Sequence, residues 1–141
     1  MTRSGVMRWR IRTVGTVLVV PPLLHLLPLH RLAPRLGRGR RYPSDPVLTE
    51  RIVGWVDRLL WRLPWPWRFT CLKRAAVLYA LLRRTGIDIE LWIGVRRDET
   101  RSLAAHAWLV HNGSPFLETG AEHIPSFQVI ARFPEAGAAV R

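Results

Sequence analysis

The fold is decided by residues 70–86, which read TCLKRAAVLYALLRRTG. Thr70 is a favourable N-cap residue, and Gly86 is the expected stop after the last turn. Apolar side chains cover most of the surface between these two signals, which predicts a helix that is central and buried. Cys71, the only cysteine of the chain, falls in the first turn of this helix.

Cys71 has two interpretations. A free cysteine is often no more than a small buried hydrophobe. At the start of a helix, however, the backbone amides and the helix dipole stabilise a thiolate. Lys73 and Arg74 add positive charge where the dipole disfavours cations. That cost indicates a use, either for a thiolate or for an anionic substrate group, but position alone leaves the structural and the catalytic interpretation equally open.

A histidine and an acid follow Cys71 in the order of a catalytic triad. His106 comes 35 positions later, in the run Ala105-His106-Ala107, and Glu118 comes 12 positions after that. A cysteine nucleophile, a histidine base and an orienting acid form the machinery of cysteine peptidases. The small alanines on both sides of His106 leave room for a partner to approach it.

Alternating apolar residues predict strands after the helix. They occupy residues 87–95, 103–110 and 127–133, and residues 114–118 return from a turn at His111-Asn112-Gly113. A helix carrying the cysteine and a sheet of hairpins carrying the histidine and the acid indicate an α+β fold.

The length of the turn between the second and third strands decides whether His106 and Glu118 lie on the same face of the sheet. A two-residue loop, Asn112-Gly113, pairs Ala107 with Glu118 and puts His106 and Glu118 on opposite faces. A three-residue loop that also includes His111 pairs His106 directly with Glu118 on one face. If Glu118 orients His106, the three-residue loop is expected.

Two other histidines and four other acids compete for these roles. His111 lies in the turn and His123 stands beside a proline, so exposure is expected for both. The competing acids are less well placed by this argument; they are Asp88, Asp98, Glu99 and Glu122.

Upstream of residue 70, the sequence predicts one further helix of the core. Asp45-Pro46 is a helix start, with the aspartate as N-cap and proline at the first helical position. Apolar residues at helical spacing follow, and Pro64 ends the helix. The aromatic connector at residues 65–67 is either a core plug or a wall beside Cys71, and aromatic residues more often fill cores.

The first 43 residues have a different character. Residues 1–41 hold nine arginines and no acid, so they carry +9 of the formal net charge of +12. Residues 13–29 are almost wholly apolar, but they are shorter than a spanning helix and contain Pro21, Pro22 and Pro28, which should break a helix. We expect residues 1–43 to be a docking segment and linker, for a partner protein or a membrane surface, and residues 44–141 to be the peptidase domain. The plainer alternative is a pair of helices packed on the core.

The composition and motifs of the chain also limit which disulfides, cofactors and partners can be expected. With one cysteine, no internal disulfide forms, so the sequence does not call for an oxidising compartment. There is no glycine-rich phosphate loop and no cysteine/histidine cluster with metal-ligand spacing, so we expect no cofactor and no metal. We expect a cytoplasmic protein that does not bind nucleic acid, with peripheral membrane contact through residues 1–43 as the alternative.

Four blocks of sequence carry a resemblance to a known family. They are CLKRA at 71–75, LLRRTG at 81–86, WIGV at 92–95 and AHAW at 105–108. In this order and spacing they resemble the leader peptidases of lasso-peptide biosynthesis, over residues 45–133. The resemblance implies a small transglutaminase-like, papain-like cysteine peptidase fold. It also implies removal of the leader from a ribosomally made precursor, so that a separate ATP-using cyclase can close the ring.

The resemblance assigns roles residue by residue. Cys71 matches the nucleophile, His106 the base, and Glu118 the third position, which is usually aspartate in the family. Because the segment before residue 44 is too short for a recognition domain, the resemblance implies a separate leader-recognition protein. The alternatives are acyl transfer to an amine at the same site, as in transglutaminases, and a non-catalytic scaffold that binds the precursor or the cyclase.

Overall fold

A computed structural model of the chain describes residues 3–37, 42–43, 45–65, 67, 70–97, 100, 102–117 and 121–134. The helices are α1 (Arg3–Leu26), α2 (Leu29–Leu36), α3 (Pro46–Arg62), α4 (Cys71–Arg84) and the short 3-10 helix η1 (Ala121–Ser126). The strands are β1 (Ile89–Arg97), β2 (Leu103–His111), β3 (Ser114–Phe116) and β4 (Gln128–Phe133).

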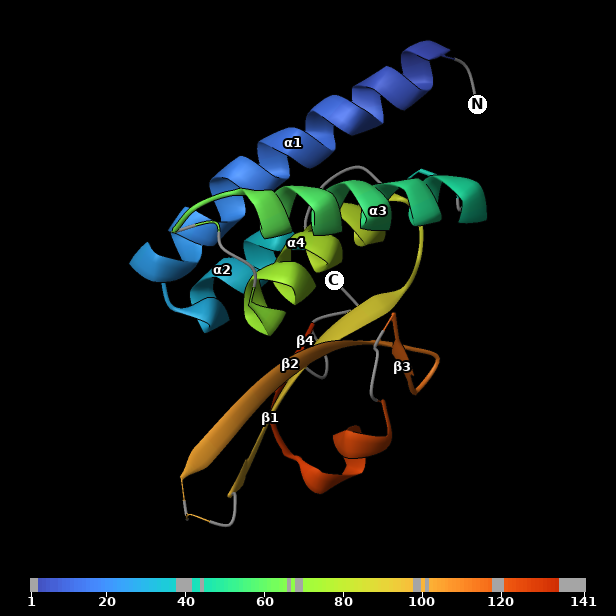
Figure 1. The fold of residues 1–141 in the computed structure, drawn as a ribbon. Coiled ribbons are helices and arrows are strands. Elements are labelled where there is room, and N and C mark those ends of the chain that lie inside the picture. The colour runs from blue at the N-terminus through green and yellow to red at the C-terminus, as the bar shows by residue number, and fades with distance from the viewer. Residues whose placement is uncertain are drawn as a thin grey trace.

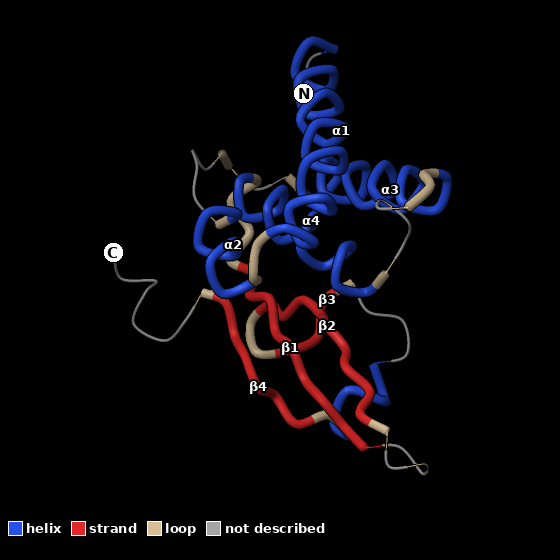
Figure 2. The backbone as a smooth tube through the Cα atoms, turned by 90° about the vertical axis from the view of Figure 1, so that its left-hand side faces the viewer, coloured by secondary structure: helices blue, strands red, loops and turns tan. Residues whose placement is uncertain are grey.

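The helices and the sheet form two layers. α1 to α4 gather on one face of the sheet, and η1 lies against the other face (Figure 1). The strands run side by side in the order β3-β2-β1-β4, and every pairing is antiparallel (Figure 2). This confirms the predicted α+β class with an antiparallel sheet.

Local capping signals set the ends of α3 and α4. The Asp45 carboxylate accepts hydrogen bonds from the amides of Val47 and Leu48, with proline at the first helical position. The Thr70 hydroxyl accepts from the Lys73 amide at 3.2 Å. Gly86, with φ of +83°, ends α4 in the left-handed conformation that glycine adopts without strain. These three predictions are confirmed.

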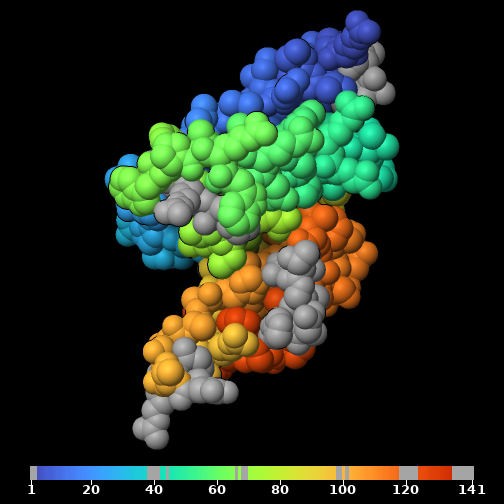
Figure 3. All heavy atoms as spheres, in the orientation of Figure 1, coloured from blue at the N-terminus to red at the C-terminus, as the bar shows by residue number. Residues whose placement is uncertain are grey.

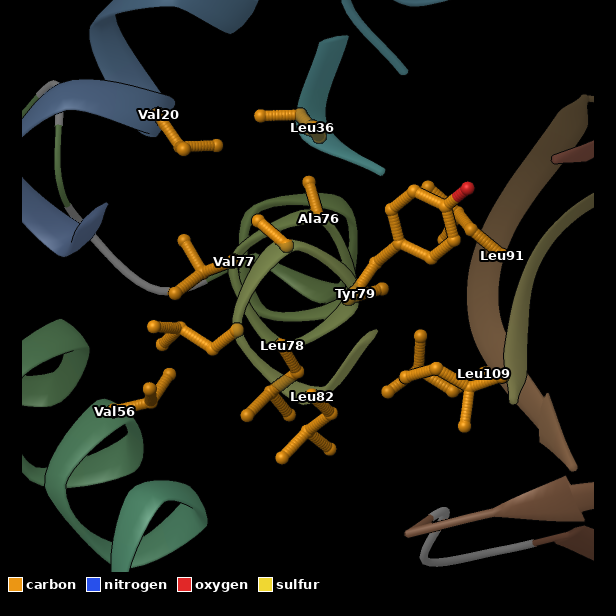
Figure 4. Packing of buried hydrophobic residues seen from close by; sticks show 14 of the residues in the cluster. Val20, Leu36, Val56, Ala76, Val77, Leu78, Tyr79, Leu82, Leu91 and Leu109 are labelled. Atoms are coloured by element: carbon orange, nitrogen blue, oxygen red, sulfur yellow. The ribbon is translucent and has the colours of Figure 1, made fainter. Parts of the chain in front are cut away.

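α4 is the centre of the core. Every residue from Ala75 to Leu82 is buried, and neighbours surround the helix on all sides (Figure 4). Tyr79 points toward Leu91 on the sheet side, Val77 faces the helical layer, and Leu36 of α2 lies above Ala76 in Figure 4. A helix that is apolar on all sides needs such a complete cover, which explains why the other elements are arranged around it.

The prediction that Pro21 and Pro22 break the N-terminal helix was wrong. α1 continues through both prolines to Leu26. Pro22 has no N–H for the carbonyl of Leu18, and the indole Nε1–H of Trp67 donates to that oxygen instead, at 2.9 Å. An external donor thus satisfies the carbonyl that the proline leaves unpaired.

Of the two hairpin loops that the sequence left open, the structure has the two-residue one, not the three-residue loop expected if Glu118 orients His106. β2 and β3 pair His111 with Ser114, so the loop is the two residues Asn112 and Gly113. Both have positive φ, +52° and +78°, as a type I′ turn requires. β3 stops at Phe116 because Leu117, at φ of +57°, is left-handed and leaves the ladder.

α1 and α2 share the core of the rest of the chain. Their buried residues join the same hydrophobic cluster as α3, α4 and the sheet; they are Trp9, Val17, Val20, Leu32, Ala33 and Leu36. Part of the expected linker, residues 38–41 and 44, lies outside the described residues. No helix in the described part of the chain is long and apolar enough to cross a membrane. Docking by residues 1–43 stays a prediction.

Candidate active site

Cys71 is the first residue of α4 and is half-buried. Thr70 caps the helix by binding the amide of Lys73, and the carbonyl of Thr70 accepts from the amide of Arg74. Within the described residues, the amides of Cys71 and Leu72 have no acceptor, as is usual for the first turn of a helix. These two donors and a helix without acids in its first turn make this end of α4 an anion-stabilising position.

Arg74 ties the first turn of α4 to two other elements. Its Nε donates to Asp57 Oδ1 of α3 at 2.7 Å, and its Nη2 donates to Asp57 Oδ2 at 3.4 Å. Its Nη1 donates to the carbonyl of Leu117 at 3.0 Å. The guanidinium therefore fixes the segment immediately before Glu118 against the turn that begins with Cys71. Glu118 itself lies outside the described residues.

His106 lies in β2, opposite Gly94 of β1. Its ring stacks on Trp108, with centroids 5.7 Å apart and planes 19° apart, and lies 5.5 Å from the Phe127 ring. Ala107 and Leu109, which alternate with His106 and Trp108, belong to the core cluster around α4. The imidazole therefore points to the face of the sheet that η1 covers, and half of it is buried.

The structure places Cys71 and His106 on elements that pack together, α4 and β2, but does not join their side chains. In the described part of the chain, no hydrogen bond links the Cys71 sulfur to the imidazole, whose ring neighbours are Trp108 and Phe127. The catalytic assignment of Cys71, His106 and Glu118 stays a prediction.

His111, the competing histidine on β2, is at the other end of α4. Its Nδ1 is 3.2 Å from the carbonyl of Asp88, and Arg83 of the last helical turn is 3.9 Å from the Asp88 carboxylate. Because a 14-residue helix spans about 20 Å, this corner is remote from Cys71. The side chain of His123 lies outside the described residues.

Lys73 carries a buried cation in the first turn of α4. The residue is only 7% exposed, so its stem is buried, and burial lowers the pKa of its ammonium group. Within the described residues, no group of three or more histidine, cysteine, aspartate or glutamate side chains is placed to hold a metal ion.

Comparison with known families adds the deciding observation. The sequence profile of the Transglutaminase-like superfamily matches residues 9–132, most of the chain. The chain belongs to this superfamily. The transglutaminase-like superfamily generally comprises enzymes of the cysteine-protease type, and its small papain-like α+β fold agrees with a buried helix packed on an antiparallel sheet. No curated protein and no solved structure matches the chain.

Sequence reasoning missed the contacts that surround the predicted residues. Asp57 could have been noticed as an acid directly after Val56, at the edge of the apolar stripe of α3. Nothing in the sequence, however, indicated that it would pair with Arg74. Phe127, which covers His106, was predicted only as the start of a strand. Sequence alternation does not say which face of a sheet a later loop will cover.

Proposed function

We propose that this transglutaminase-like protein is a cysteine peptidase that removes the leader from a ribosomally made lasso-peptide precursor. Its product would be the core peptide with a free N-terminus, ready for ring closure by a separate ATP-dependent cyclase. The observation that carries the proposal is Cys71, the sole thiol, half-buried at the N-terminus of the buried helix α4. The block resemblance around residues 71–75 and 105–108 supports the substrate class.

In the proposed reaction, His106 takes the proton of the Cys71 thiol, and the sulfur attacks the carbonyl carbon at the leader–core junction. The tetrahedral oxyanion is stabilised by the amides of Cys71 and Leu72, which have no acceptor within the described residues. His106 then gives its proton to the leaving amine of the core peptide. Water, deprotonated by His106, hydrolyses the thioester and releases the leader.

Glu118 is proposed to orient the imidazole and stabilise its protonated form. Support comes from Leu117, whose carbonyl Arg74 holds at 3.0 Å, because this contact anchors the chain one residue away from Glu118. Leu117 itself is left-handed, so the register of β3 ends at Phe116 and does not assign Glu118 to a face of the sheet.

The proposal makes a geometric demand. Because the imidazole lies on the face of the sheet opposite α4, His106 must leave its stack with Trp108 entirely and turn past the edge of its strand to reach hydrogen-bond distance of Cys71 when precursor binds. Catalytic hydrogen bonds often tighten only in the substrate complex. A separate leader-recognition protein is proposed to deliver the precursor, and the cyclase to receive the product.

The decisive experiment incubates the purified chain with precursor and recognition protein and follows the products by mass spectrometry. Cys71→Ala and Cys71→Ser should abolish cleavage while the far-ultraviolet circular dichroism and the melting curve stay as in the wild type. Cleavage by Cys71→Ala would end the cysteine-peptidase proposal. Unfolding of both variants would return Cys71 to a purely structural role.

His106→Ala has a matched control on the same strand, His111→Ala. The first should lower the cleavage rate by at least about 100-fold, since general acid–base catalysis contributes that much or more, and the second should cut at a rate near wild type. Glu118→Gln should also slow cleavage strongly, with Glu90→Gln as its control. Equal rates in both members of either pair would remove that residue from the mechanism.

The same incubation separates the alternative chemistries. Hydrolysis gives a leader that carries one added water, whereas acyl transfer, favoured by the superfamily to which the chain belongs, gives a leader joined to an added primary amine. A non-catalytic scaffold gives neither product, with the wild type and with Cys71→Ala alike.

A further inference from the structure

α1 has two apolar faces, and only one of them is covered. The covered face lies on α3 and α4 and consists of Trp9, Thr13, Val17 and Val20. On the opposite side, large apolar residues recur at spacings of four, three and four positions and remain exposed; they are Met7, Ile11, Val14 and Leu18. Helical geometry puts these four side chains in one stripe. Figure 3 shows α1 along the outer rim of the molecule.

Arginines border the stripe on both sides. At 3.6 residues per turn, the exposed Arg3 and Arg10 fall on one side of the stripe and the exposed Arg8 falls on the other, whereas Arg12 lies further round and donates to the Tyr42 hydroxyl at 3.1 Å. Neither α1 nor α2 contains an acidic residue. An apolar stripe between two basic edges is the arrangement of helices that lie in the interface of an anionic membrane.

Two basic hollows flank the stripe as well. One is lined by Arg3, Val6, Met7, Arg10 and Arg51. The other lies between α1, α2 and α4 and gathers Arg12, Arg35 and Arg84 around an apolar wall. The Nε of Arg84 is buried and has no hydrogen-bond partner within the described residues. Arg12 is held by the Tyr42 hydroxyl at 3.1 Å, so Arg35 and Arg84 are the guanidinium groups that the second hollow offers. Each hollow therefore places at least two guanidinium groups beside apolar side chains, which suits a phosphate group joined to an acyl chain.

We propose that the outer face of α1 lies flat on an anionic phospholipid surface, with the stripe in the acyl boundary and the arginines on lipid phosphates. A membrane fits better than a protein partner because arginines lie on both sides of the stripe. Neither α1 nor α2 has an acidic residue that would fix the orientation of a partner protein. The helix is 24 residues long, so about 36 Å of it can lie along the surface. This inference does not depend on the proposed peptidase activity.

The test measures cosedimentation of the full chain with vesicles of phosphatidylcholine and phosphatidylglycerol at a ratio of three to one, and with vesicles of phosphatidylcholine alone. We expect binding to the first and much weaker binding to the second, decreasing as salt rises. Arg8→Gln combined with Arg10→Gln should weaken binding about 25-fold, at about fivefold for each arginine. The matched control changes the exposed Arg58 and Arg97 to glutamine and should bind as wild type.

A second pair of variants tests the apolar stripe. Ile11 is 64% exposed and Ile130 of β4 is 60% exposed, so serine at either position removes a similar exposed side chain. Ile11→Ser should weaken vesicle binding about tenfold or more, and Ile130→Ser should leave it unchanged. Unchanged melting curves would show that all variants are folded.

Three results would overturn the proposal: no binding to the anionic vesicles, equal binding to both kinds of vesicle, or equal effects of Ile11→Ser and Ile130→Ser. A fourth would assign the stripe to a second copy of the chain, namely a dimer in sedimentation equilibrium without lipid that Ile11→Ser dissociates. Cleavage of a short soluble precursor is the separate readout of the proposed function, and failure of either proposal leaves the other measurable.

Discussion

Gly94 offers a sharp test of the packing around His106. A Cβ at this position would lie 2.8 Å from Trp108 Cη2, 3.0 Å from Trp108 Cζ3 and 2.9 Å from Phe127 Cβ. Trp108 is 2% exposed, so its ring has no free space to enter, and the Phe127 Cβ is bonded to the backbone. Gly94→Ala therefore requires a shift of the sheet or of the aromatic cover on its face.

The magnitude follows from two opposing effects. Overpacking a well-filled site costs about 1–3 kcal/mol, whereas alanine in place of glycine in a strand returns about 0.5–1 kcal/mol. We expect a net loss of about 1–2 kcal/mol in the free energy of unfolding. For a chain of this size, that loss lowers the melting temperature by about 3–8 °C.

The assay is thermal unfolding followed by tryptophan fluorescence and circular dichroism, together with the NMR signals of the His106 ring, which the ring current of Trp108 shifts. Gly54→Ala in α3 is the control, because its Cβ would meet nothing nearer than the Arg58 Nη2 at 3.8 Å. That variant should gain about 0.5–1 kcal/mol. A Gly94→Ala protein as stable as wild type, with unmoved His106 signals, would refute the close approach of Trp108 and Phe127.

Four further predictions concern the elements around Cys71. Lys73→Met should raise the urea midpoint at pH 7, because the lowered pKa of this lysine makes its charge a penalty in the folded state; the gain should vanish as the pH passes its ordinary value of 10.5. Asp57→Ala, which removes the bidentate partner of Arg74, should cost about 1 kcal/mol in urea unfolding and slow precursor cleavage. Trp67→Phe should cost about 0.5–1 kcal/mol by the same measure, because the α1 carbonyl loses its indole donor. A chain of residues 44–141 alone should lose its cooperative melting transition, because α1 and α2 cover α4.

Local signals explain what the sequence could predict. The N-caps at Asp45 and Thr70 and the stop at Gly86 each act within three residues of themselves, and all three are present in the structure. The buried helix at 71–84 was predictable because no soluble arrangement leaves so many apolar residues uncovered.

Tertiary contacts explain what the sequence could not predict. The break expected at Pro21 and Pro22 is absent because Trp67, distant in sequence, supplies a donor. The face of His106 depends on Phe127, which the segment after η1 brings to the sheet. Alternation along β2 shows only that residues 106 and 107 point to opposite faces. Because apolar residues occur at both sets of alternating positions, the sequence does not tell which face packs on the helices.

The hydrogen bond from Trp67 to the carbonyl of Leu18 makes two distant positions depend on one another during sequence divergence. Proline at position 22 leaves that carbonyl unpaired, and tryptophan at position 67 pairs it. In a Pro22→Ala background the helix can supply its own N–H, so the indole N–H becomes redundant and Trp67→Phe should cost less than it does in the wild type. Selection for the indole N–H at position 67 is therefore expected to weaken once proline is lost from position 22, so the two positions should change together rather than independently.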